Sequence, residues 1–501
     1  MSHDKQQTTP QFLFWACFIA LVATSFGFII RANLIDTWAH QFNLSETQKG
    51  EILGVGLWPF AISSVLFSLV IDKIGYGRSM IFAFFCHASS AFITIFAKDY
   101  WALYTGQFIV ALGNGVVEAV INPVVATIFS KEKTKWLNIL HAGWPGGMVL
   151  GGIMMLIMGP SVDWRFKVAL LLIPTLIYGL MLLRCKFPVH ERVKAGVSYK
   201  AMLQEAGILG AAIIILMMTR EVGRVFDWST TVQAVIVLVL VVVYGSYVRS
   251  LGRPMFIFLM LIMIPLAIVE LGTDSWITDL VNPVMSKIGI PPLWVLIYTA
   301  FIMMLMRFNA GPIVHRFKPL GTLAICSAMA ILGLLFLSKA AGIMIFVAAT
   351  FYALGKSFFW PTMLGVVSER IPKGGALTIN TIAGVGNLAV GVIGAAFLGN
   401  IQDKHIDQQL AGRYPDLHPR IVAVEKSSVF GAYRPLDQDK VAMLAEADKG
   451  RIKEITAEAK KSALATVAIF PTIMLICYLI LLLYFKAHGG YSVIELKELR
   501  S

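Results

Sequence analysis

Charged residues are scarce in this chain. They make up 14% of its 501 residues, whereas hydrophobic residues make up 57%. Soluble globular proteins carry about a quarter charged residues, so the composition argues against a soluble enzyme or binding domain. The mean hydropathy is +0.74, and the apolar residues come in long runs. Together these features predict an all-α integral membrane protein with many helical spans.

Cysteine is also rare. The five cysteines are Cys17, Cys86, Cys185, Cys326 and Cys477, and no two of them form a CxxC pair. The nine histidines are scattered, without an HExxH motif or a similar cluster. The sequence therefore predicts no disulfide framework, no metal site and no bound cofactor. Because no catalytic cluster is visible either, we do not expect an enzyme.

The formal net charge of +13 does not indicate nucleic-acid binding. Lys and Arg lie mainly in short connectors between apolar runs, as in the cytoplasmic loops of membrane proteins. The polar segment Met1–Gln11 leads directly into an apolar run without a small-residue cleavage pattern. We therefore expect an uncleaved first helix. The predicted location is the inner (plasma) membrane, with many spans and both termini in the cytoplasm.

The apolar runs form two sets of six. The first set is Phe12–Ala39, Gly50–Ile71, Ser79–Ala97, Trp101–Phe129, Leu137–Met158 and Phe166–Leu183. The second set is Met255–Pro283, Pro292–Ala310, Leu320–Leu337, Ile343–Val367, Ala376–Leu398 and Leu464–Phe485. Each set is long enough to build a six-helix bundle across a bilayer.

Two further runs, Ala206–Thr219 and Thr231–Val248, lie between these sets. The first has 14 residues, which is short for a bilayer. The basic connectors of both halves can all be cytoplasmic only if both further runs cross the membrane or neither does. We expect both to cross as an extra helical hairpin, which gives 12 to 14 spans in total.

The chain therefore divides into five predicted parts. These are an N-terminal bundle (1–184), a central basic segment with the extra hairpin (185–254), helices 7 to 11 of the C-terminal bundle (255–398), an external loop (399–462), and the last helix with a cytoplasmic tail (463–501). The loop holds 11 Lys/Arg and 10 Asp/Glu between Ile401 and Ser462. Its part Leu436–Lys461 has helical spacing, and it is either an amphipathic lid or a plain solvated helix.

Each half carries a glycine-containing basic segment between its second and third helices. The first is DKIGYGR at 72–78, with Asp72, Gly75 and Arg78, and the second is AGPIVHRFKPLG at 310–321, with Arg316. Here the chain resembles the major facilitator superfamily over Phe12–Gly399 and Leu464–Phe485. The resemblance implies two six-helix bundles around a central site that opens alternately to each side, with these segments as cytoplasmic gating loops.

Glu118 is a carboxylate inside a predicted span, where a charge costs at least ~2.5 kcal/mol. Asn114 and Asn122 lie four residues to either side, on the same helical face. The carboxylate either binds the coupling proton or is fixed by a helix–helix hydrogen bond. The pattern Glu118-x3-Asn122-Pro123 resembles the fucose/proton symporter branch of the superfamily, and this resemblance implies a protonation and substrate site.

Arg31 favours a different substrate class. The segment from Phe28 to Leu34 resembles the helix-1 signature of the anion/cation symporters, the sialin-like and hexuronate group, in which an arginine faces an organic anion. Ile30 stands where that signature usually has an aspartate. Alternatively, Arg31 reaches the outer interface or pairs permanently with an acid. The predicted helix ends place Arg31 ~12 Å from the depth of Glu118, so a direct ion pair does not follow.

The second half supplies further candidates. Glu270 and Asp274 share a helical face, and two like charges so close should leave at least one protonated. They are interpreted as a second protonation site, an outer gate or a plain helix end. Lys356 and Trp360, four residues apart, form a stripe with Tyr352 that either packs or stacks on a sugar ring.

Polar residues beside glycines complete the predicted site. His141 precedes a Pro-Gly-Gly bend, and Trp144 adjoins it. Both are candidates to face the central cavity. Asn380 and Asn387 lie seven residues apart, where they bind substrate hydroxyls or hydrogen-bond between helices. Arg307 is interpreted as structural because it lies at the predicted inner end of its helix.

These observations predict a secondary transporter that moves a small polar metabolite with protons by alternating access. A sugar is the first choice, a sugar acid or other organic anion the second, and a nucleoside the third. A non-transporting sensor on the same fold is the alternative from another class, but no signalling domain is visible. The expected partners are the substrate, the coupling proton and the lipid bilayer, and we expect a monomer.

Overall fold

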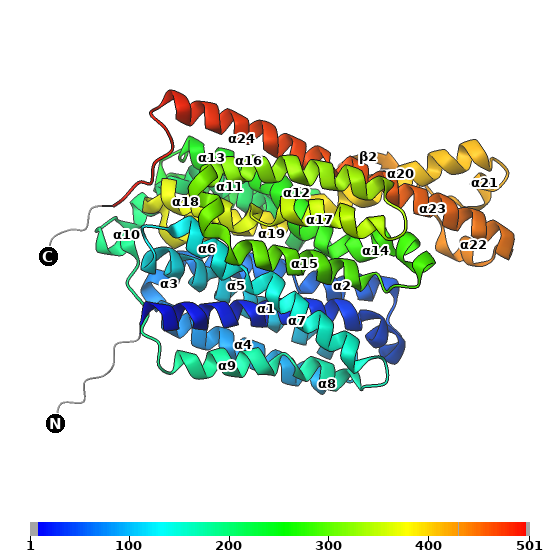
Figure 1. Ribbon diagram of the computed structural model, residues 1–501, viewed down its shortest axis with the longest axis horizontal. Helices are drawn as coiled ribbons and strands as arrows, with labels where there is room; N and C mark the ends of the chain where they lie inside the picture. Colours follow the sequence, from blue (N-terminus) through cyan, green and yellow to red (C-terminus); the bar gives the residue numbers. More distant parts are fainter. Residues whose placement is uncertain (1–8, 429, 497–501) are drawn as a thin grey trace.

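A computed structural model describes residues 9–428 and 430–496 of the chain. Its long helices run side by side along one axis (Figure 1). The start of α1 and the end of α24 lie at the same end of this bundle, which is called the termini face below. The opposite end is called the loop face, because the segment between α20 and α23 projects from it (Figure 1).

The described part of the N-terminal half contains nine helices. They are α1 (Pro10–Phe42), α2 (Glu46–Val55), α3 (Trp58–Ile74), α4 (Tyr76–Ile95), α5 (Tyr100–Ile128), α6 (Lys133–His141), α7 (Gly143–Met158), α8 (Trp164–Ala169) and α9 (Leu172–Leu182). Three predicted spans are divided in two, at Gly56, Ala142 and Leu170. A connector with α10 (Glu191–Lys194) leads to the hairpin α11 (Tyr199–Val225) and α12 (Thr230–Val248).

The C-terminal half begins with α13 (Pro254–Ala267), the π-helical segment η1 (Ile268–Gly272), α14 (Thr273–Met285) and the 3₁₀ turn η2 (Ser286–Ile288). It continues with α15 (Leu293–Phe308), α16 (Ala310–Lys339), α17 (Met344–Lys356), α18 (Phe359–Arg370) and η3 (Pro372–Gly374). The last membrane elements are α19 (Gly375–Ala389), the π-helical segment η4 (Val390–Ala395), α20 (Ala396–Arg413), α23 (Glu446–Val467) and α24 (Ile469–Ala487).

Among the described residues, twelve helices are long and apolar enough to cross a membrane, or thirteen if one sharply bent pair counts as a span. Both hairpin helices are in this set. The run Ala206–Thr219 belongs to α11, which has 27 residues. Polar residues extend the run at both ends, and the helix is kinked at Gly207. The helix α15 is only 16 residues long, and the predicted span Ile343–Val367 is divided into α17 and α18. For this reason, neither α15 nor the divided span Ile343–Val367 is among the twelve helices.

The hairpin packs against the bundle mainly through α11. The helix α11 contacts α19, α13 and α3, so it covers the seam where the two halves meet. The helix α12 packs mainly on α11, and only 6% of its most apolar stretch is buried. Because its outer surface is apolar, α12 is suited to face lipid.

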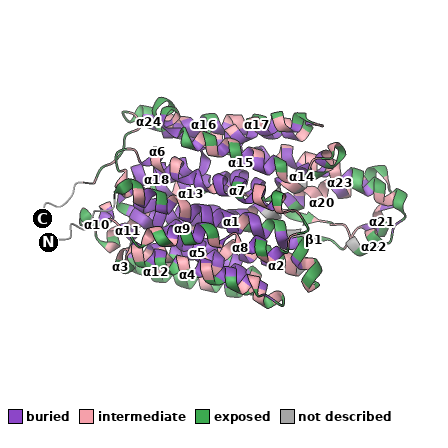
Figure 2. Ribbon diagram, turned by 60° about the horizontal axis from the view of Figure 1, so that its bottom comes forward, coloured by how far each residue is buried: buried purple, intermediate pink, exposed green. Residues whose placement is uncertain are grey.

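The segment at the loop face forms a small unit of its own. It contains α21 (His418–Ile421), the antiparallel strands β1 (Lys426–Ser428) and β2 (Gly431–Tyr433), and α22 (Gln438–Ala442). A separate apolar core holds it together, formed by Ile406, Leu410, Leu417, Ile421, Leu444, Ile452, Ile455 and Ala459. The buried residues of Figure 2 run mainly along the inner helices, whereas α21 and α22 are largely exposed.

The two basic segments differ in structure. At the first, Gly75 has φ +90° between α3 and α4, a conformation that favours glycine, and Asp72 pairs with Arg192 of the connector. Arg78 is exposed at the termini face. The second segment is mainly helical: α16 begins at Ala310, and its helical conformation is interrupted at Lys318, which precedes a proline. Arg316 is exposed there and lies over the ring of Phe317.

Close packing of α3 on α5 gives the first prediction. A Cβ atom on Gly115 would lie 2.0 Å from the Ser63 hydroxyl oxygen and 2.2 Å from the carbonyl oxygen of Phe60. The substitution Gly115→Ala should therefore lower the free energy of unfolding by ~1–3 kcal/mol, measured by thermal unfolding in detergent. The control is Gly50→Ala, because no atom lies within 4 Å of that added Cβ. Equal melting temperatures for the two variants would contradict the packing described.

Candidate functional site

A cavity lies at the centre of the bundle, between the two halves. It is lined by Leu21, Phe60, Glu118, His141, Trp144, Glu270, Leu271, Arg307, Trp360 and Asn387. Its volume is about 30 Å³, which suits a few water-sized particles at most. Sites for small organic ligands span ~300–1,000 Å³. The structure is therefore contracted around this point, and the halves must separate to admit a metabolite.

The helices that line the cavity are interrupted beside it. His141 ends α6, and Trp144 follows in α7. Glu270 lies in the π-helical segment η1, Trp360 follows the break between α17 and α18, and Asn387 precedes the π-helical segment η4. Interrupted helices are a usual way to place polar groups at a transporter site. The sequence predicted these residues, but not that breaks would bring them to one cavity.

Glu118 joins the two halves without a cationic partner. Its carboxylate is 4% exposed and accepts hydrogen bonds from Trp360 Nε1 and Asn387 Nδ2, each at 3.3 Å. No ion pair within 9–428 and 430–496 includes Glu118. The carboxylate is therefore held by neutral donors from the opposite half, which stabilise the charge less than a cation does.

The flanking asparagines serve other contacts. Asn122 Oδ1 lies 2.9 Å from His141 Nε2, so it ties α5 to α6 beside the cavity. Asn114 Oδ1 lies 2.9 Å from His87 Nε2, inside the N-terminal half. The predicted cluster of three polar residues thus contributes one carboxylate to the cavity and two contacts within its own half.

The sequence predicts that charge repulsion leaves a proton on Glu270 or Asp274, but in the structure each acid faces its own cation. Arg307 Nη2 donates to Glu270 Oε1 at 2.5 Å, and Lys356 pairs with Asp274. Glu270 lies in the π-helical segment η1, and Asp274 lies one turn later in α14. Each buried acid therefore has its own buried cation, and neither acid needs a shared proton.

Arg307 is the functional candidate that sequence reasoning missed. It is 1% exposed and donates to the carbonyl oxygens of Ser357 at 2.7 Å and His141 at 2.9 Å, in addition to Glu270. It therefore joins α15 to the breaks in two other helices. A signal was present, because Arg307 is the one charged residue in the predicted span Pro292–Ala310.

The predicted stripe on helix 10 is divided by the break at Ser357–Phe358. Before the break, the Tyr352 hydroxyl donates to the carbonyl oxygen of Val269, and Lys356 Nζ lies 5.2 Å from the Tyr352 ring centre. After it, Trp360 faces Glu118 and also donates its backbone N–H to Glu270 Oε2 at 2.9 Å. Trp360 is therefore the member of the stripe that reaches the central cavity.

The remaining predicted residues divide between the cavity and its surroundings. Trp144 lines the cavity, and its Nε1 has no hydrogen-bond partner among the described residues. Asn380 Nδ2 donates to the carbonyl oxygen of Ala119 at 3.1 Å, so it joins the halves beside the cavity. Arg31 lies elsewhere, next to Gln107, which precedes Glu118 by 11 residues, or ~16 Å of helix.

Polar contacts join the halves at the termini face. Thr134 Oγ1 donates to Glu369 Oε1 at 2.5 Å, and Asn138 Nδ2 donates to Thr362 Oγ1 at 3.1 Å. Lys133 Nζ bridges Glu191 at 2.5 Å and the carbonyl oxygen of Ser368 at 3.3 Å. This face is closed by hydrogen bonds between α6 and α18 and by the ion pair of Lys133 with Glu191 of α10.

Charged loop residues extend this junction. Glu132 accepts from Lys135 at 3.0 Å and lies 3.0 Å from His315 of the other half. The hydrogen bond from Lys135 lowers the pKa of Glu132, so the carboxylate is ionised at neutral pH. Burial lowers the pKa of His190 to about 4, so the imidazole is neutral there and accepts the backbone N–H of Arg192 at 3.1 Å.

On the loop-face side, the wall of the cavity is mainly apolar. A smaller space there is lined by Phe28, Leu57, Phe60, Leu271 and Val390, together with Trp144, Asp274, Ser275 and Asn387. Separating apolar side chains breaks no hydrogen bond, whereas opening the termini face breaks several. The contacts therefore favour an opening toward the loop face from this conformation.

The Asp274–Lys356 pair gives the second prediction. The substitution Lys356→Met leaves a buried carboxylate unpaired and should destabilise the protein by ~3–5 kcal/mol. The double variant Asp274→Asn, Lys356→Met removes both charges and should recover most of that loss. Thermal unfolding of the two single variants and the double variant measures this coupling. A double variant as unstable as the sum of the single effects would contradict the pairing.

Comparisons with known proteins agree with this architecture. The family described as Major Facilitator Superfamily matches residues 16–397. A probable sugar efflux transporter of Helicobacter acinonychis is 25% identical over 154 residues, which are 30% of this chain and 39% of that protein. One from Pasteurella multocida is 24% identical over 143 residues, 28% and 35% of the two chains. The chain thus spans well under half the length of these relatives.

Solved structures with the same fold cover nearly the whole chain. The E. coli fucose:proton symporter FucP is 16% identical, with a TM-score of 0.56 over 91% of this chain and 98% of its own. The human organic anion transporter MFSD10 is 10% identical, with a TM-score of 0.59 over 94% and 100%. The proton:xylose symporter XylE is 14% identical, with a TM-score of 0.58 over 92% and 94%. At these identities the likeness shows the fold alone.

Proposed function

This chain belongs to the Major Facilitator Superfamily, a family of secondary transporters, and we propose that it moves a small neutral sugar together with protons. Substrate binds at the central cavity, and Glu118 carries the coupling proton. The single observation that carries this proposal is the contact of Glu118 with Trp360 and Asn387 of the opposite half, without any cation.

Proton coupling follows from the balance of charges around the cavity. Arg307 and Lys356 each have an acidic partner, Glu270 and Asp274, so these four groups keep their charges in pairs. Glu118 alone relies on neutral donors from the other half. When the halves separate, the carboxylate loses those donors, and protonation compensates for the loss. Movement of the halves and protonation of Glu118 are thereby coupled.

A neutral substrate suits the groups that remain free. Both cations nearest the cavity are paired with acids, so they offer no strong site for a substrate carboxylate. Trp144 Nε1 is an unpartnered donor in the cavity wall, and Asn387 can exchange its bond to Glu118 for one to a hydroxyl. Indole rings and amides are suited to sugar rings and hydroxyls. The names of the distant relatives, sugar efflux transporters, are consistent with this class.

The orientation proposed for the membrane follows from charge. Lys133, Lys135 and His315 gather at the termini face, with the ends of the described chain. By the positive-inside rule this face is cytoplasmic, and the segment 399–462 is external. We propose the plasma membrane as the location and a monomer as the working unit, with sugar acids and nucleosides as the alternative substrates.

The third prediction concerns Glu118→Gln, which keeps the shape of the side chain and removes its charge. Proton-driven accumulation should be lost, whereas counterflow exchange of sugar should persist. Coupling to one proton sustains about tenfold accumulation per pH unit, since one unit equals about 1.36 kcal/mol, and the variant should reach equilibrium only. Uptake by reconstituted vesicles measures both. The control is Glu51→Gln, an exposed carboxylate on α2. Normal accumulation by Glu118→Gln would refute the proton site.

The fourth prediction concerns substrate class. Neutral sugars should raise the melting temperature by binding the folded state, and sugar acids should not. The variant Trp144→Phe loses one donor and should weaken the sugar response about tenfold. Trp101→Phe is the control, because Trp101 is 69% exposed at the start of α5. A response to sugar acids alone would replace the sugar proposal with an organic anion.

A further inference from the structure

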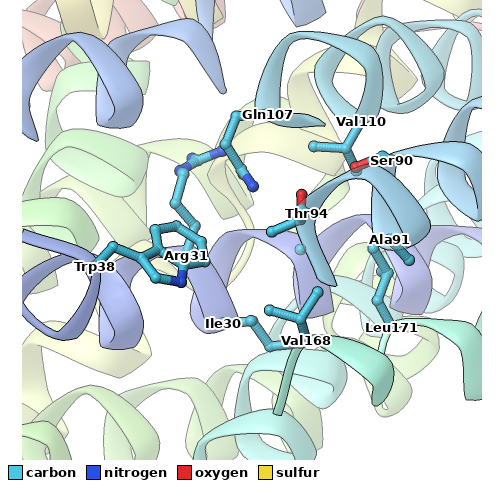
Figure 3. Close-up of a pocket in the computed structure, with 11 residues that line it drawn as sticks. Ile30, Arg31, Trp38, Ser90, Ala91, Thr94, Gln107, Val110, Val168 and Leu171 are labelled. Carbon is cyan, nitrogen blue, oxygen red and sulfur yellow. The ribbon is translucent and has the colours of Figure 1, made fainter. Parts of the chain in front are cut away.

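A second polar pocket lies inside the N-terminal half, away from the central cavity. Its lining includes Arg31 and Trp38 of α1, Thr94 of α4 and Gln107 of α5 (Figure 3). The remaining lining residues are Gly27, Ile30, Ser90, Ala91, Val110, Val168 and Leu171. All of them precede the hairpin, so this pocket does not depend on contact between the halves.

Arg31 is buried there without a partner. It is 4% exposed, it takes part in no hydrogen bond or ion pair within 9–428 and 430–496, and its Nε is unsatisfied. Among the described residues, the guanidinium makes a cation–π contact with Phe28, whose ring centre lies 5.7 Å from the guanidinium carbon. An arginine keeps its charge at any ordinary pH, and burying an unpaired charge is very costly. Something must compensate this charge.

The fold holds the guanidinium in place. A Cβ atom on Gly56 would lie 1.5 Å from Arg31 Nη1 and 2.1 Å from its Cζ, so the group is wedged against the backbone between α2 and α3. Glycine is required at this point for close approach. The wedge keeps the charge beside the pocket.

The other free polar groups around the pocket are also donors. Trp38 Nε1 and Thr94 Oγ1 are buried without a hydrogen-bond partner among the described residues. An indole N–H only donates, and a guanidinium only donates. No Asp or Glu of the described chain lines the pocket. Three groups that can donate and one net positive charge therefore line a space in which the described residues offer only neutral acceptors, such as the amide of Gln107.

The geometry points to a binding site for a small monovalent inorganic anion, of the size of chloride, between Arg31, Trp38 and Thr94. A water molecule would accept hydrogen bonds but would leave the charge uncompensated, whereas an anion does both. The cavity volume is about 20 Å³, close to that of one water-sized particle and too small for a sugar. The anion stabilises the N-terminal half in every state of the transport cycle.

The test uses the purified full chain in detergent. Sodium chloride or bromide replaces sodium gluconate at constant ionic strength, and the melting temperature is measured. The wild type should show a saturable rise with either halide, and Arg31→Met should show none. Thr94→Val and Trp38→Phe each remove one donor and should weaken the halide dependence about tenfold. These two variants keep the test valid if Arg31→Met does not fold. Arg451→Met, at an exposed arginine of α23, is the control.

Crystals grown with bromide locate the ion by its anomalous scattering, and the peak should lie beside Arg31 Nε. The proposal is overturned if the halide response persists in Arg31→Met or if halide and gluconate give the same melting temperature. It is also overturned if the wild type shows no peak in this pocket. A response to formate but not to halides would assign the pocket to a carboxylate and also overturn it. Glu118→Gln should keep the full halide response, so failure of the transport proposal is distinguishable from failure of this one.

Discussion

The central constraint in this molecule is a carboxylate in the membrane interior that no cation of the described residues neutralises. Glu118 accepts its hydrogen bonds from Trp360 and Asn387, so its stability depends on contact between the two halves. Such a group costs several kcal/mol when it is charged and unsupported. We propose that the protonation state of this residue and the relative position of the two bundles are therefore linked, which is the property that a proton-coupled transporter needs.

The surrounding structure makes this link specific to Glu118. The pairs Glu270–Arg307 and Asp274–Lys356 fix the other buried charges within the C-terminal half. Helix breaks beside the cavity supply backbone groups, such as the carbonyl oxygen of Ser357, that Arg307 requires. The halves are joined by polar contacts at the termini face and mainly by apolar ones toward the loop face. The charge pairs thus stabilise the C-terminal half by itself, and the two halves can separate at the loop face.

Apolar runs are sufficient to predict the class and the two sets of helices, because a bilayer demands long apolar segments. The extra hairpin is predicted only when the positions of the basic connectors are considered as well. Glu118, His141, Trp144, Trp360 and Asn387 stand out as polar residues in such segments, and the structure brings all five to one cavity. Three interpretations differ from the contacts in the structure. Residue spacing places Glu270 and Asp274 close together, but it does not reveal that each acid meets a cation of another helix. The position of Arg307 near the predicted inner end of its helix indicates a structural role. That position does not reveal that its side chain meets Glu270 at the cavity. Resemblance places Arg31 near a substrate anion, whereas packing against Gly56 holds it in its own half.

Calorimetry of sugar binding in buffers of different ionisation enthalpy tests the role of Glu118 most directly, because it counts the protons that accompany the substrate. We predict that binding to the wild type exchanges protons with the buffer, and that binding to Glu118→Gln exchanges none while remaining measurable. If the variant exchanged the same number of protons as the wild type, Glu118 would not be the coupling group, and the proposed link between its protonation and the movement of the two halves would be wrong.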